Sequence, residues 1–187
     1  MSVVAIVPAR SGSKRIRNKN LKKIGSVSLV RQAALVGIHT STIEKVILDT
    51  DSKRIAKECE NLRILIAPLR PTFLSNDFTS SVDSVLFLLD SLKDLIKKDD
   101  VIVLLQPTNP FRTVQLVESA INLFLRKNKK YSVIASSVPL FAIKDFFIAN
   151  RQNRIIENLS KRNSTQENII YDTGAVYVTS PKLLLKE

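Results

Sequence analysis

The residues best suited to chemistry lie between Ala5 and Ile24, where a short apolar run passes directly into a turn crowded with cations. Gly12 stands between Ser11 and Ser13, and such small residues let main-chain N–H groups approach phosphate oxygens. The stretch has no carboxylate, and its basic residues are Arg10, Lys14, Arg15, Arg17, Lys19, Lys22 and Lys23. Because uncompensated like charges repel one another, a bound polyanion best explains the cluster. The loop therefore predicts a nucleoside triphosphate site.

The glycine pattern of this loop differs from the common phosphate motifs. A Walker loop needs two glycines ahead of Lys-Ser/Thr, and a dinucleotide fingerprint needs three spaced glycines, whereas this loop has only Gly12. A solvated basic loop therefore stays open as an alternative.

Composition narrows the class of protein. A chain of 187 residues with 44% apolar content predicts one compact α/β domain, and four glycines with no Trp disfavour a turn-rich all-β fold. No run approaches the roughly 20 apolar residues needed to cross a bilayer. Strand-like sequence begins within three residues of the start, which predicts no signal peptide. Cys59 is the single cysteine and fits a reducing compartment, so we expect a cytoplasmic protein.

The net charge of +12 suggests either nucleic-acid binding or a small anionic substrate. Nucleic-acid modules usually interleave aromatic and basic residues, and the basic loop contains no aromatic residue. The sequence therefore favours the small anion, with nucleic-acid binding as the less favoured reading.

Apolar runs alternate with helical patterns along the chain. Strands are predicted over 3–7, 45–50, 62–67, 100–106, 131–137 and 174–179, and helices over 28–39, 81–97 and 114–127. The strands are continuously apolar, which is typical of a mostly parallel, doubly wound α/β sheet. We expect a nucleotide-binding domain over 1–138 plus 173–187. Residues 139–172 lack periodicity and predict an insertion that packs on a second subunit, with disorder as the alternative.

Ligands of open α/β sheets bind beyond the carboxyl ends of the strands, so the polar residues at those ends are candidates. They are Asp49, Thr50, Asp51, Ser52, Arg70, Ser80, Ser81, Asp83, Gln106, Thr108, Asn109 and Arg112. Some of them, such as Asp51, Ser52 and the Ser80–Ser81 pair, are explained equally well as helix caps. Gln106 follows a buried strand and needs a hydrogen-bond partner, which a nucleotide base would supply.

Taken together, these blocks resemble the CMP-sialic acid synthetases, or acylneuraminate cytidylyltransferases. The matching blocks are PARSGSKRIRNKNL, ILDTDSKRIA, RPTFLSNDFTSS, LLQPTNPFRT and GAVYV, and they span residues 3 to 179. The resemblance implies a nucleotide-diphospho-sugar transferase-like fold and a homodimer formed through 139–172. It implies Mg²⁺-dependent transfer of CMP from CTP to the anomeric hydroxyl of N-acetylneuraminate or a related nonulosonate, with release of pyrophosphate.

The resemblance also implies roles for individual residues. Arg10 and Lys14 would be catalytic, and Gln106 would meet the base. The implied CTP-binding residues are Arg10, Ser11, Gly12, Ser13, Lys14, Lys19, Asn20, Arg70, Ser81 and Gln106. Thr108, Lys144 and Arg162 are the implied sugar contacts.

The chain departs from the family pattern in three places. Thr173 stands where the family usually has Asn, and Arg162 only roughly replaces an Arg-Gln-x-Leu-Pro stretch. The family's Asp-x-Asp block, which binds magnesium, does not occur before Glu187, which leaves Asp51 or the phosphates of the nucleotide to hold the metal. We therefore expect either a fragment or a shortened relative with altered activity. An inactive CTP-binding scaffold and a cytidylyltransferase for another keto-acid sugar remain alternatives.

Overall fold

The computed structural model describes residues 1–13, 15–75, 80–137, 147–149, 155–158 and 171–185. The chain divides into two compact units, Met1–Ala135 with Gly174–Glu187, and Ser136–Thr173. The boundaries predicted from the sequence lie close to this division. The pairing of the second unit with another subunit stays a prediction.

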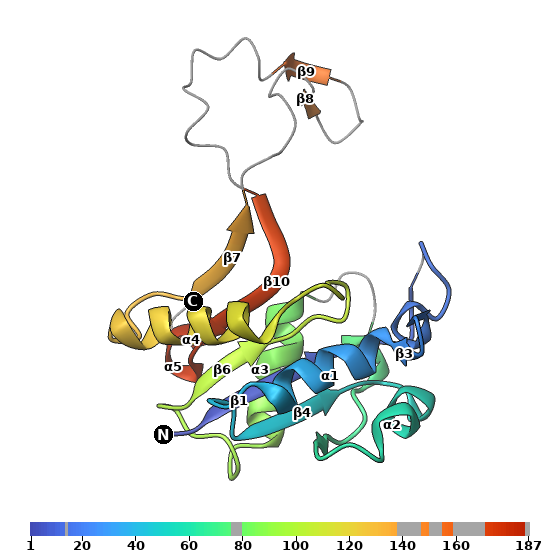
Figure 1. The fold of residues 1–187 in the computed structure, drawn as a ribbon, viewed down its shortest axis with the longest axis horizontal. Helices are drawn as coiled ribbons and strands as arrows, with labels where there is room; N and C mark the ends of the chain where they lie inside the picture. Colours follow the sequence, from blue (N-terminus) through green and yellow to red (C-terminus); the bar gives the residue numbers. More distant parts are fainter. Residues whose placement is uncertain (14, 76–79, 138–146, 150–154, 159–170, 186–187) are drawn as a thin grey trace. The chain divides into compact units, whose positions relative to one another are not determined.

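The first unit is built on a six-stranded sheet with the order β5-β4-β1-β6-β10-β7 (Figure 1). Its strands are β1 (Val3–Pro8), β4 (Lys45–Asp49), β5 (Leu65–Ile66), β6 (Val101–Leu104), β7 (Val133–Ser137) and β10 (Tyr171–Thr179). β1 runs parallel to β4 and β6, and β4 runs parallel to β5, whereas β10 is antiparallel to β6. The prediction of a mostly parallel α/β sheet is confirmed.

Helices cover both faces of this sheet. The helices α1 (Leu29–His39), α2 (Lys53–Cys59) and α4 (Val114–Arg126) pack on one face, and α3 (Ser81–Ser91) and α5 (Pro181–Leu184) pack on the other (Figure 1). Alternate residues of β1 serve the two faces, since Ala5 and Val7 join the first core and Val4 and Ile6 the second. Burial on both faces explains why the strands read as continuous apolar runs.

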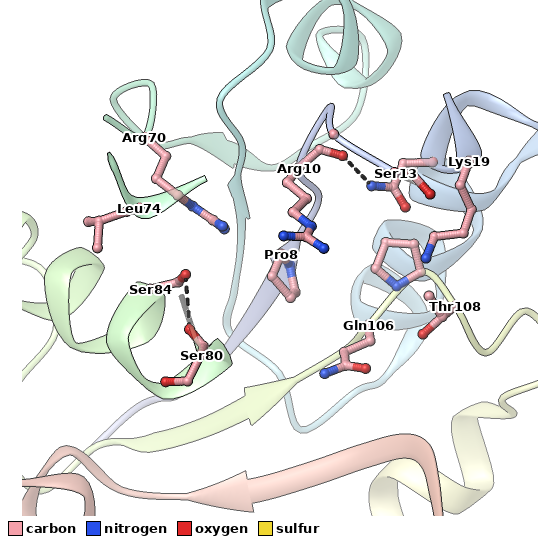
Figure 2. Close-up of a pocket in the computed structure, with 13 residues that line it drawn as sticks. Pro8, Arg10, Ser13, Lys19, Arg70, Leu74, Ser80, Ser84, Gln106 and Thr108 are labelled. Carbon is pink, nitrogen blue, oxygen red and sulfur yellow. Dashed lines mark hydrogen bonds between the residues drawn. The ribbon is translucent and has the colours of Figure 1, made fainter. Parts of the chain in front are cut away.

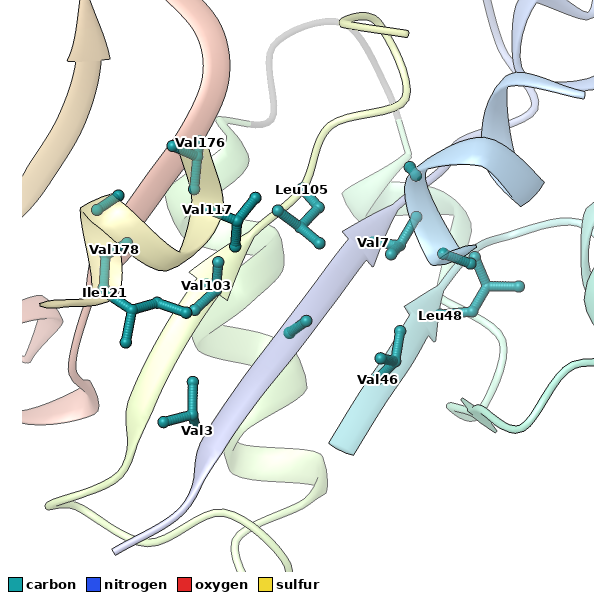
Figure 3. Packing of buried hydrophobic residues seen from close by; sticks show 14 of the residues in the cluster. Val3, Val7, Val46, Leu48, Val103, Leu105, Val117, Ile121, Val176 and Val178 are labelled. Carbon is teal, nitrogen blue, oxygen red and sulfur yellow. The ribbon is translucent and has the colours of Figure 1, made fainter. Parts of the chain in front are cut away.

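The larger core lies between the sheet and α1, α2 and α4. Figure 3 shows Val117 and Ile121 of α4 beside Val103 of β6 and Val178 of β10. The register pairs Val178 with Val103, so the antiparallel strand extends this core without a break. This packing fixes the carboxyl end of β6 relative to β1, where the polar loops emerge.

Several local elements differ from the sequence expectations. The helix predicted over 81–97 ends at Ser91, because Leu92 leaves helical geometry at φ −118° and ψ 27°. The strand predicted over 62–67 is only Leu65–Ile66. The sequence patterns missed the hairpin of β2 (Lys23–Ile24) and β3 (Val27–Ser28) and the short 3₁₀ turns η1 (Lys19–Leu21) and η2 (Thr72–Leu74). Gly25 turns this hairpin at φ 62°, where a side chain would be strained.

The second unit contains β8 (Phe147–Ala149) and β9 (Ile155–Asn158), which pair as a two-stranded antiparallel sheet. Among the described helices, none has the length and apolar character required to span a bilayer.

Candidate active site

The strand order reverses direction between β1 and β6, and a pocket opens there at their carboxyl ends. Such switch points are the usual ligand sites of open α/β sheets. The pocket has a volume of about 220 Å³. It is lined by Pro8, Arg10, Gly12, Ser13, Lys19, Asn20, Arg70, Leu74, Ser80, Ser84, Gln106, Pro107 and Thr108. Figure 2 shows Arg10, Arg70 and Gln106 converging on it from three separate segments.

Most of the predicted site residues lie in this single pocket. Those that line it are Arg10, Gly12, Ser13, Lys19, Asn20, Arg70, Gln106 and Thr108. Ser11 lies instead against Asp51, outside the lining of this pocket. Lys14, Lys144 and Arg162 fall outside the described residues. Ser81 begins α3, but its side chain is also outside the described part.

The basic loop is held in shape by two polar side chains. Asn20 is buried, and its Nδ2 donates a hydrogen bond of 2.8 Å to the main-chain oxygen of Arg10. The carboxylate of Asp51 accepts hydrogen bonds from Ser11, at 2.7 Å from the main-chain N–H and 2.8 Å from the hydroxyl. These bonds hold Arg10 and Ser11 in place without a ligand, which lowers the entropy cost of binding.

The hydrogen bonds of Asp51 with Ser11 disfavour the prediction that Asp51 holds magnesium. Both of its oxygens are engaged by Ser11, and Asp49 is engaged by Arg70. No cluster of three His, Cys, Asp or Glu side chains suited to a metal occurs among the described residues. The described part of the chain therefore does not fit a protein-bound Mg²⁺, and we derive no step through one.

We expect Asp51→Ala to weaken CTP binding about three- to tenfold, because the loop at Ser11 would lose two hydrogen bonds and would have to order on binding. Calorimetry with and without MgCl₂ measures this effect. If Asp51 acts only on the loop, the loss is equal in both conditions. A loss seen only with magnesium would contradict the role in loop positioning.

Arg70 has a charged partner that its sequence neighbours do not reveal. Its guanidinium binds Asp49 at the end of β4, with Nε donating to Oδ1 at 3.1 Å and a terminal nitrogen donating to Oδ2. Both side chains are buried, and the Arg70 N–H also binds the carbonyl of Thr50 at 2.9 Å. Burial raises the pKa of the Asp49 carboxyl, while the hydrogen bond and charge of Arg70 oppose that rise. The pair holds a guanidinium at the wall of the pocket.

The amino-terminal end of α3 also borders the pocket, through Ser80 and Ser84. The Ser80 hydroxyl accepts a hydrogen bond from the Asp83 N–H, and Asp83 accepts one from the Ser80 N–H, which makes a capping box. Hydrogen bonds that the Ser80 hydroxyl and the Ser80 N–H donate to the carboxylate lower the pKa of Asp83. The helix-cap interpretation of Ser80 is confirmed. Ser80 was among the candidate residues at the strand ends, and it lines the pocket, whereas Ser84 was not predicted. Its position one helical turn after Ser80 was a usable signal.

A second pocket, of about 310 Å³, adjoins the first and shares Gln106 with it. Its walls are mostly apolar, and its lining residues are Val82, Val85, Ile102, Leu104, Gln106, Ser132, Ile134, Tyr177, Val178, Thr179 and Leu184. Gln106 thus stands between a cationic pocket and an apolar one. This arrangement suits a ligand with an anionic part and a less polar part.

Comparison with known proteins decides the class of enzyme. The model of the cytidylyltransferase family matches residues 4–176, which is most of the chain. The chain belongs to the cytidylyltransferase family. It is therefore a nucleotidyltransferase that uses CTP, and the family resemblance found in the sequence is confirmed.

This cytidylyltransferase is similar to two curated relatives and to one solved structure. It is 28% identical over 194 residues to the CMP-N,N'-diacetyllegionaminic acid synthase of Legionella pneumophila, covering all of this chain and 81% of that protein. It is 33% identical over 134 residues to the N-acylneuraminate cytidylyltransferase of Escherichia coli, covering 72% of this chain and 30% of that protein. CMP:2-keto-3-deoxy-manno-octonic acid synthetase, solved with CTP, matches all of this chain and 77% of its own, with a TM-score of 0.73 at 16% identity. The last likeness shows the shared fold.

Proposed function

We propose that this cytidylyltransferase transfers CMP from CTP to the anomeric hydroxyl of a nonulosonic sugar acid and releases pyrophosphate. The observation that carries the proposal is the single pocket in which Arg10, Lys19 and Arg70 meet Gln106. Its cations suit a triphosphate, and the Gln106 amide offers both a donor and an acceptor to a base edge. The two curated relatives are named for sugar acids of this class.

In the proposed reaction, the sugar hydroxyl oxygen attacks the α-phosphorus of CTP. A new P–O bond forms, and the bond from the α-phosphorus to the oxygen bridging the β-phosphorus breaks. Pyrophosphate leaves with that electron pair, and the hydroxyl proton passes to solvent. Such a transfer needs positioning and cations rather than covalent help from the protein. Arg10 and Lys19 are the described residues that we assign to the phosphates, with Lys14 as their predicted neighbour.

We assign the acceptor sugar to the apolar second pocket, next to Gln106. The relative from Legionella is named for a diacetylated sugar acid, and the methyl of each acetyl group would gain from an apolar wall. Thr108 lines the first pocket, so its proposed contact with the sugar rests on the resemblance. The roles proposed for Lys144 and Arg162 in sugar binding rest on the resemblance alone.

A pyrophosphate-release assay tests the proposal. The enzyme is incubated with MgCl₂, CTP and a panel of sugar acids, namely N,N'-diacetyllegionaminate, N-acetylneuraminate and 3-deoxy-manno-octulosonate. We expect release with a nonulosonate and little with UTP in place of CTP. CTP binding without release for any acceptor would support the inactive CTP-binding alternative. Absence of CTP binding would overturn the assignment of the pocket.

Three further parts of the proposal concern cofactor, assembly and location. We propose that Mg²⁺ enters with the triphosphate, since the carboxylates of Asp51 and Asp49 already bind Ser11 and Arg70. We propose a homodimer through 139–172, because a two-stranded sheet such as β8–β9 is marginally stable alone and gains from a partner. Sedimentation of a monomer at micromolar concentration would contradict the dimer.

We propose a cytoplasmic location, because Cys59 is a free, buried thiol.

A further inference from the structure

The loop that carries Gln106 is fastened from outside the pocket by Arg112. This arginine follows β6 and is only 5% exposed. Its Nε donates to the carbonyl of Ala175 in β10, and a terminal nitrogen donates to the carbonyl of Gln106 at 2.6 Å. One guanidinium thus ties the end of β6 to β10. The rigid guanidinium fork binds the two carbonyls through two separate nitrogens, whereas a lysine would present all of its donors from one ammonium at the end of a flexible stem.

A second, half-buried side chain also holds this loop. Gln32 in α1 donates from Nε2 to the carbonyl of Pro110 at 2.7 Å. Arg112 and Gln32 together fix both ends of the loop 106–112. Neither is among the residues that line the nucleotide pocket.

Burying the Arg112 side chain costs folding free energy, so a role in packing alone does not explain it. One of its terminal nitrogens is buried without a hydrogen-bond partner in the described structure, and its two acceptors are neutral carbonyls. Burial lowers the pKa of Arg112 to about 10. A buried cation without a carboxylate partner and with an unused donor opposes stability. Its presence is better explained by the geometry that it imposes on Gln106.

That geometry concerns the side chain of Gln106 directly. A Cβ atom added at Gly174 would lie 3.7 Å from Oε1 of Gln106, so the amide lies close to Gly174 within β10. Gly174 has φ 65°, a backbone conformation in which a residue with a side chain would be strained. Ala175 is the next residue of β10. Because Arg112 binds the carbonyls of both Gln106 and Ala175, it sets the spacing between the amide and its support.

We propose that Arg112 is a positioning residue for base selection, which orients the Gln106 amide so that the pocket distinguishes cytosine from uracil. The inference rests on the proposed CTP site. Cytosine presents an amino group where uracil presents a carbonyl oxygen, so an amide held in one orientation favours one of the two bases. An amide free to rotate can satisfy either base, since it carries both a donor and an acceptor.

Arg112→Lys tests the proposal, because it keeps the charge and loses the fork. Calorimetry measures affinity for CTP, UTP and inorganic tripolyphosphate, with Arg126→Lys at the exposed end of α4 as the matched control. We expect the ratio of CTP to UTP affinity to fall about tenfold or more in Arg112→Lys and to stay at the parent value in the control. Tripolyphosphate affinity should stay within about twofold of the parent, since the cations of the loop are untouched.

Two outcomes separate this inference from the proposed function. If the parent enzyme itself does not prefer CTP to UTP, the proposed CTP site is wrong. If the parent prefers CTP and Arg112→Lys keeps that preference, the role of Arg112 is wrong.

Should Arg112→Lys fail to fold, Gln32→Leu decides the question, because it releases the same loop at Pro110 and leaves Arg112 in place. A reduced CTP preference with unchanged tripolyphosphate binding then supports the proposal. An equal loss for all three ligands, or no loss for any of them, overturns it.

Discussion

Arg10→Ala should lower kcat/KM for CTP by about 100- to 1000-fold, the usual cost of removing one group that stabilises charge developing in a transition state. Arg10 follows β1 and lines the pocket at the point where the strand order reverses. Its main-chain oxygen is held by Asn20, so the backbone of the loop should survive the truncation. Steady-state release of pyrophosphate at several CTP concentrations measures the effect.

Arg17→Ala is the matched control for Arg10→Ala. Arg17 belongs to the same basic loop, but its side chain is exposed and does not line the pocket. We expect it to change kcat/KM by less than about threefold at physiological salt, because exposed charges are strongly screened. Equal losses for both variants would mean that the loop acts only through its total charge, and the assignment of Arg10 to the phosphates would fail.

Arg70→Met should cost about 3–5 kcal/mol of unfolding free energy at pH 8, because it leaves the Asp49 carboxylate buried without its cation. Urea unfolding measures the loss. The double variant Asp49→Leu/Arg70→Met should recover most of the stability, since an apolar pair of similar size is often as stable as a buried ion pair. If Arg70 also contacts CTP, the double variant regains stability but not CTP binding. Recovery of both would restrict Arg70 to a structural role.

The pH dependence of Arg70→Met follows from the same pair. Burial already raises the pKa of Asp49, and loss of the opposing Arg70 raises it further. A carboxyl whose pKa is higher in the folded than in the unfolded state stabilises the fold at low pH, and that contribution is lost as the pH rises through the folded pKa. The deficit of Arg70→Met relative to the parent should therefore shrink between pH 8 and pH 4. A deficit independent of pH would contradict this account.

The basic loop can be recognised from the sequence alone, whereas the role of Gln106 depends on the tertiary structure. Cations around Gly12 mark a polyanion site by their types and spacing alone. Gln106 becomes informative only because β6 lies next to β1, which brings its amide to the same pocket as Arg10. Its second role, between the nucleotide pocket and the apolar pocket, required the position of β10 as well.

The sequence by itself determined the strands, most of the helices, the helix caps and the phosphate character of the first loop, because each depends on neighbours within a few residues. Apolar periodicity predicted β1, β4 and α4, and Ser80 was a recognisable N-cap for α3. Charge counting found the basic loop. These properties are local, so the order of the strands in space does not alter them.

Only the tertiary structure decided which polar groups meet. Arg70 binds Asp49, 21 positions away, and Asp51 binds Ser11, 40 positions away, so one expected ligand contact and one expected metal ligand turned out to have protein partners. Arg112 reaches Ala175 across 63 positions. These pairs follow from the order of the strands in the sheet, and periodicity carries no information about that order, because every buried strand has the same apolar pattern whichever neighbours it takes.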